Sequence, residues 1–102
     1  MPPIEDYLEH ADELAQEVVN AWGVNMRAGN AAFLTGEFKA VFDRACRYRS
    51  AKNGADNHRQ VNMLNEQDAA EETATRQGFA EAYRTFWEKH QAAASRFRGG
   101  ER

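Results

Sequence analysis

The residues that could perform chemistry are few and lie far apart along the chain. His10, His58 and His90 could each bind a metal or transfer a proton, but none has a second His or Cys at the spacing of a metal site. The single cysteine, Cys46, lies near arginines that could lower the pKa of its thiol, although no general base lies beside it in the sequence. We therefore expect no enzyme activity, no metal and no cofactor.

A basic segment is the main candidate for binding an anion. In residues 44–59, basic side chains alternate with the aromatic Tyr48, a combination that can hold phosphates and stack on a base. As an alternative function, this predicts that a nucleic acid or a nucleotide binds through Arg44, Arg47, Arg49, Lys52 and Arg59. The overall acidity of the chain, with a formal net charge of −3, argues against this alternative.

Charge is also segregated along the rest of the chain. Residues 1–26 contain acids but neither Lys nor Arg, residues 39–59 are net positive, residues 60–82 are net negative and residues 83–102 are net positive. Either antiparallel helices place these opposite charges side by side, or one charged face docks an external partner. The acidic side chains that would form such a face are Glu9, Asp12, Glu13, Glu17, Asp68 and Glu72.

Composition and periodicity together predict an all-α chain. The only prolines are Pro2 and Pro3, and β-branched aliphatic residues, which strands favour, are scarce. Apolar residues recur at spacings of three and four, as on one face of a helix. We predict a small helical bundle, in which residues 4–29 and 31–53 form an N-terminal helical hairpin and residues 58–98 form one long C-terminal helix.

Several residues set the expected helix boundaries. Either Gly23 or Gly29 could end the first helix, and we expect Gly29 to do so. The second helix begins at about Ala31 or restarts at Thr35-Gly36. The pair Asn53-Gly54 predicts a stop, followed by a polar turn. Asn65 is expected to cap or kink the long helix, which is otherwise continuous. Arg49 and Lys52 fall on the apolar side of the second helix, where they either reach water or meet carboxylates of another segment.

The supply of large apolar side chains is small for a chain of 102 residues. Much of the apolar fraction of 42% is alanine, and residues 65–77 are polar on all sides. A chain of this size buries only about two-thirds of its unfolded surface even with a richer composition. We therefore expect a homodimer or higher oligomer, in which a self or partner interface is formed by Trp22, Phe33, Phe79, Tyr83, Phe86, Trp87, His90 and Phe97.

These features favour one function over the alternative. We expect a non-enzymatic helical module for protein–protein interaction that acts as a regulator, adaptor or inhibitor of a protein partner, as a homo-oligomer. The predicted organisation is a single domain over residues 1–98 with a frayed tail at 99–102. A lone thiol and the absence of a signal-like or membrane-spanning apolar run predict a cytoplasmic protein with no membrane contact.

Overall fold

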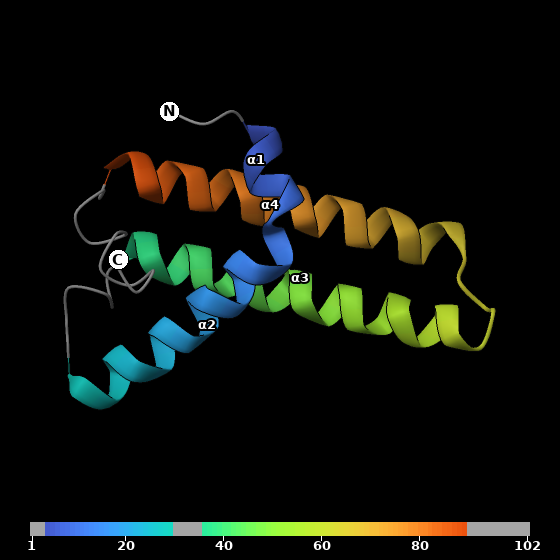
Figure 1. Ribbon diagram of the computed structural model, residues 1–102, viewed down its shortest axis with the longest axis horizontal. Coiled ribbons are helices and arrows are strands. Elements are labelled where there is room, and N and C mark those ends of the chain that lie inside the picture. The colour runs from blue at the N-terminus through green and yellow to red at the C-terminus, as the bar shows by residue number, and fades with distance from the viewer. Residues whose placement is uncertain (1–3, 30–35, 90–102) are drawn as a thin grey trace.

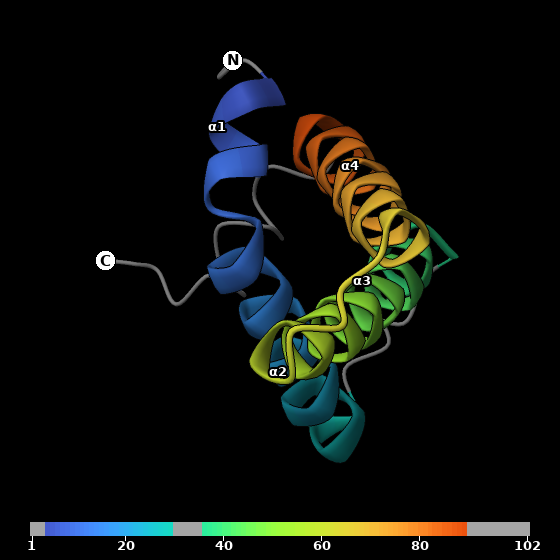
Figure 2. The same ribbon diagram turned by 90° about the vertical axis from the view of Figure 1, so that its right-hand side faces the viewer.

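The chain folds as a helical bundle. The computed structural model describes residues 4–29 and 36–89, and its elements are α1 (Ile4–Glu9), α2 (Ala11–Ala28), α3 (Gly36–Gln60) and α4 (Glu66–Lys89). The two long helices, α3 and α4, form an antiparallel pair (Figure 1). With the α3–α4 pair seen nearly end on, α1 lies beside α4 and α2 passes beneath α3, both at a steep angle to the pair (Figure 2). The predicted all-α class is confirmed, whereas the boundary at residue 98 and the tail lie outside the described residues.

The first predicted helix is divided at His10. A single helix over residues 4–29 was expected, but the backbone at His10 leaves helical geometry, with φ −105° and ψ 20°. From α4, the Nε–H of Arg76 donates to the Leu8 carbonyl oxygen at 2.9 Å. In a continuous helix that carbonyl would accept the amide of Asp12. An inserted side chain is a known cause of a helix kink, and Arg76 supplies it here.

The end of this segment is as predicted. Gly29 adopts a left-handed conformation with φ 68°, and its N–H donates to the Met26 carbonyl oxygen at 3.2 Å. Glycine takes this conformation without the steric cost that a β-carbon imposes. α2 therefore ends at Ala28, where the sequence indicates.

The predicted stop at Asn53-Gly54 is wrong, because α3 continues through both residues to Gln60. The methyl group of Ala55 is buried in the α3–α4 contact, and Lys52 pairs with Asp56 one helical turn later. These contacts offset the roughly 1 kcal/mol that a glycine costs inside a helix. His58, expected to start the long helix, belongs to α3 instead.

The turn between α3 and α4 is fixed on both sides by backbone caps. At the end of α3, the N–H of Asn62 donates to the Arg59 carbonyl and that of Met63 to the His58 carbonyl, at 3.1 and 2.7 Å. This is a Schellman arrangement, with Asn62 at φ 60°. At the start of α4, the amide of Asp68 donates to Asn65 Oδ1 at 2.8 Å, which confirms Asn65 as a cap.

A single apolar core joins all four helices. In α3 it contains four residues with the predicted spacing of three and four: Phe38, Val41, Ala45 and Tyr48. Its rings pack face to face or tilted; Phe38 lies 5.3 Å from Phe86 between ring centroids, and Tyr7 lies 5.6 Å from Tyr83. Trp22 stacks on Phe42 at 4.5 Å and covers one end. Each of these rings therefore contacts a ring of another helix of the same chain.

This core corrects the predicted partner interface. Phe79, Tyr83 and Phe86 are at most 3% exposed, because α1, α2 and α3 of their own chain already cover them. They therefore cannot serve as surface contacts for a partner. Trp22 and Trp87 are half-buried against the same core. The remaining predicted contacts, Phe33, His90 and Phe97, lie outside the described residues.

Beyond this core, the α3–α4 pair extends as an arm. We use the name α3–α4 arm for residues 52–76, which include the end of α3, the turn and the first half of α4. The arm begins where α1 crosses α4, and its outer part with the turn projects past that crossing (Figure 1). Among the described helices, none is long and apolar enough to cross a lipid bilayer.

Candidate functional site

The arm is held together by ion pairs between the segments of opposite charge. Arg59 of α3 pairs with Glu72 of α4 and with Asp56 of its own helix. His58 contacts Asp68 Oδ2 at 2.5 Å. Three of the predicted acidic residues, Asp12, Asp68 and Glu72, are thus opposed by basic groups of the same chain. For these residues the alternation of charge reflects pairing between neighbouring helices.

The rest of the predicted acidic face lies on α1 and α2. Glu9 is exposed, Glu13 is exposed and contacts His10 at 3.3 Å, and Glu17 is half-buried. The structure therefore divides the predicted acidic face between Asp68 and Glu72, which are paired within the arm, and a set on the N-terminal helices, of which Asp12 faces Lys52 of α3.

The predicted basic residues do not form one continuous free surface. Lys52 and Arg59 are engaged in ion pairs. The exposed Arg44 and Arg47 line grooves beside α4, whereas Arg49 lies about 140° around the helix from Arg44. Five basic groups close in sequence are therefore distributed over different sides of α3.

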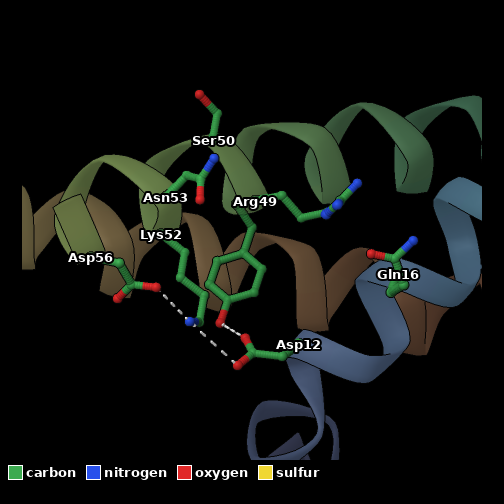
Figure 3. A pocket seen from close by; sticks show the side chains of 8 residues that line it. Asp12, Gln16, Arg49, Ser50, Lys52, Asn53 and Asp56 are labelled. Atoms are coloured by element: carbon green, nitrogen blue, oxygen red, sulfur yellow. Dashed lines mark hydrogen bonds and ion pairs between the residues drawn. The ribbon is translucent and has the colours of Figure 1, made fainter.

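A surface pocket lies between the start of α2 and the middle of α3. Its volume is about 540 Å³, and its lining is polar. Lys52 reaches across it, with Nζ 2.9 Å from Asp56 Oδ2 and 3.8 Å from Asp12 Oδ2 (Figure 3). We call it the α2–α3 pocket; its lining residues are Asp12, Gln16, Tyr48, Arg49, Ser50, Lys52, Asn53 and Asp56.

The hydroxyl of Tyr48 donates a hydrogen bond to Asp12 Oδ1 at the base of this pocket. Burial raises the pKa of the Tyr48 phenol above its ordinary value, and the hydrogen bond to Asp12 raises it further. The hydrogen bond to Asp56 raises the pKa of Lys52, and that same bond lowers the pKa of the Asp56 carboxyl. The pocket therefore holds a neutral phenol, a cation and two carboxylates in one connected network.

The thiol of Cys46 is not activated. Burial raises its pKa, and the favourable charge of Arg49 offsets this only in part. The nearby arginines therefore do not bring that pKa below its ordinary value. In the described part of the chain, no group of three or more His, Cys, Asp or Glu side chains could hold a metal ion.

The tip of the arm exposes three large apolar side chains that the predicted interface did not include. Val61 is 60% exposed, Met63 68% and Leu64 37%. All three lie in the turn between α3 and α4, outside both helices. The signal that could have identified them is their position around Asn62, which favours left-handed geometry, and directly before Asn65, which caps a helix.

Arg76 has a structural role and was not among the predicted site residues. It lies on the face of α4 that continues the apolar stripe, where a charged residue is unexpected. Its contact with the Leu8 carbonyl explains the position, because it joins α1 to α4 across the edge of the core. The feature that could have identified it was the interruption of the stripe itself.

Comparison with known proteins identifies no relative of this chain. No family model, no curated protein and no solved structure matches the chain.

Proposed function

We propose that the protein is a non-enzymatic helical interaction module that binds a protein partner through the tip of the α3–α4 arm. One observation carries the proposal: Val61, Met63 and Leu64 are exposed together on a turn that is capped on both sides. Exposed clusters of large apolar side chains often mark protein interaction surfaces. The module would act as a regulator or adaptor.

The cap geometry supports a preformed contact surface. The Schellman hydrogen bonds end α3, and the Asn65 side chain starts α4, so the backbone of the tip is defined in the free protein. A preordered contact loses less conformational entropy on binding than a flexible one. The apolar core is buried within one chain and does not include the tip side chains, so removing those side chains should leave the fold intact.

A second copy of the chain is the first partner to test. In a symmetric dimer each copy uses the same patch, so the tip of one copy would contact the tip of the other. This arrangement retains the expected homo-oligomer but moves its interface from the core aromatics to the tip.

The experiment compares a triple variant with a matched control. Val61→Ser, Met63→Ser and Leu64→Ser are combined, and the control combines Val24→Ser and Met26→Ser, two exposed apolar residues at the end of α2. Sedimentation velocity measures self-association. Tagged protein is used to capture partners from cells of its source. Each captured protein is then purified, and the affinity of that protein for the wild type and for both variants is measured.

The proposal expects association with itself or with a purified partner that weakens about tenfold or more in the tip variant and is unchanged in the control. It is overturned if the tip variant associates and binds as the wild type does, or if the wild type neither self-associates nor retains any partner.

The arrangement of the basic residues gives less support to nucleic-acid or nucleotide binding. Two of the five are paired with carboxylates and the others lie on different sides of α3. A salt titration of binding to single-stranded and duplex DNA and RNA distinguishes the two functions. Salt-sensitive binding that is lost when Arg44, Arg47 and Arg49 are replaced together by Ala would favour the alternative.

A further inference from the structure

The α2–α3 pocket has the size and lining of a binding site for a small polar molecule. Its volume of about 540 Å³ lies within the range of ligand pockets in proteins. The lining consists of two carboxylates, two cations, two amides, the Ser50 hydroxyl and the Tyr48 phenol, and its only aliphatic groups are the stems of polar side chains such as Lys52 and Arg49. A ligand for this pocket must therefore be hydrophilic.

Charge pairing within the pocket leaves one cation for a ligand. Asp12 uses one oxygen for the Tyr48 hydroxyl and faces Lys52 with the other, while Asp56 accepts from Lys52 and from Arg59. Among the described side chains, Arg49 forms no ion pair. Its guanidinium is exposed and lines the wall on the side of Gln16 (Figure 3).

Two amides lie in the same pocket. The Gln16 side chain donates through Nε2 to Asn20 Oδ1 at 3.0 Å, and its carbonyl oxygen lies on the side facing Arg49 (Figure 3). Asn53 belongs to α3, one turn beyond Arg49. An amide can accept from a hydroxyl of a ligand and donate to its oxygen atoms.

We infer that the α2–α3 pocket binds a small hydroxylated monocarboxylate whose carboxylate is held by Arg49. A guanidinium presents two parallel N–H groups that match the two oxygens of a carboxylate. The hydroxyl groups of the ligand meet the amides of Gln16 and Asn53. A doubly charged phosphate is disfavoured, because the carboxylates of Asp12 and Asp56 lie in the same pocket and repel a second negative charge.

The test uses glycerate as the probe, with glycerol and inorganic phosphate as comparisons at constant ionic strength. Titrations are followed by the backbone and side-chain NMR signals of ¹⁵N-labelled protein. Arg49→Gln removes the charge, and Arg47→Gln is the matched control, because Arg47 is also exposed on α3 but lines the groove beside α4 instead. Both side chains are exposed, so both variants should fold.

Saturable binding of glycerate that shifts the Gln16 and Asn53 amide signals is expected, with a loss of about tenfold or more in Arg49→Gln and no change in Arg47→Gln. The inference is overturned if glycerate does not bind at up to about 50 mM, if glycerol or phosphate binds equally well, or if both variants lose affinity alike. The tip variant should bind glycerate as the wild type does, so this result is independent of the proposed function.

Discussion

The two halves of the α3–α4 pair are joined by different kinds of contact. In the half covered by α1 and α2, Phe38 and Tyr48 of α3 face Phe79 and Phe86 of α4, and all four are at most 3% exposed. In the arm, the same two helices are joined by Arg59–Glu72 and His58–Asp68. Exposed ion pairs each contribute about 0–1 kcal/mol, much less than the burial of an aromatic ring. Stability is therefore concentrated in one half, and the other half is free to present a surface.

The contrast also shows what alanine contributes. Ala11, Ala15, Ala45 and Ala80 are all completely buried. A buried alanine loses no side-chain rotamer freedom and allows two helices to approach closely. A modest number of aromatic rings can therefore be enclosed by one chain, and a count of large apolar residues underestimates the core.

The largest expected effect comes from breaking the apolar half. Phe38→Ala removes a fully buried ring that contacts Trp22 and Phe86, and we expect a loss of about 3–5 kcal/mol in the free energy of unfolding. Urea unfolding followed by circular dichroism measures it. A loss below about 1 kcal/mol would mean that this half is not the stable one.

Breaking the contact between α1 and α4 should have the next largest effect on stability. Arg76→Ala removes the donor to the Leu8 carbonyl, and we expect a loss of about 1–3 kcal/mol together with faster amide exchange in α1. Arg84→Ala is the control, because its ion pair with Glu88 is about half exposed and should contribute little. Equal losses in the two variants would contradict a specific role for Arg76.

The hydrogen bond at the boundary of the two halves gives a smaller effect that depends on pH. Tyr48→Phe keeps the ring and removes the donor to Asp12, for an expected loss of about 1 kcal/mol at neutral pH. The folded-state pKa of Tyr48 is raised, so the contribution of the neutral phenol is complete below the ordinary value of 10.0 and is lost as the pH rises from there through the raised pKa.

Urea unfolding of wild type and Tyr48→Phe from neutral pH to about pH 11 tests this dependence. The difference in the free energy of unfolding between wild type and variant should shrink above about pH 10. A difference that stays constant or grows with pH would show that the phenol is not held neutral by the fold.

A change within the arm should be the smallest and should be stabilising. Gly54 lies inside α3, and a β-carbon there would meet no heavy atom within 4 Å. Gly54→Ala should therefore raise the free energy of unfolding by about 0.5–1 kcal/mol. Gly29→Ala is the opposite control, since φ is +68° there and an alanine is strained. A loss of stability in Gly54→Ala would indicate that the chain turns at Asn53-Gly54, as the sequence predicts, and does not continue as a helix.

The parts of the fold that could be predicted are those with local causes. Helical periodicity identified the buried face of α3, and Gly29 and Asn65 marked boundaries through their own backbone or side chain. The end of α3 could not be predicted, because the contacts that carry the helix past Gly54 include the burial of Ala55 against α4, which is a tertiary contact.

The same limit applies to the candidate sites. The sequence left open whether Lys52 reaches water or meets a carboxylate. Its partners are Asp56 and Asp12, and Asp12 is brought there by the crossing of α2. The hydrogen bond between Tyr48 and Asp12 joins residues 36 positions apart, which no helical periodicity encodes. The exposed tip depended on the true end of α3 and was missed with it.

Amide hydrogen exchange of the dilute protein, resolved along α3 and α4, tests most directly whether stability is divided between the two halves. Residues 38–48 and 79–86 should exchange only with global unfolding, whereas residues 56–72 should open at a clearly lower free energy. Uniform protection of both helices along their whole length would contradict the division.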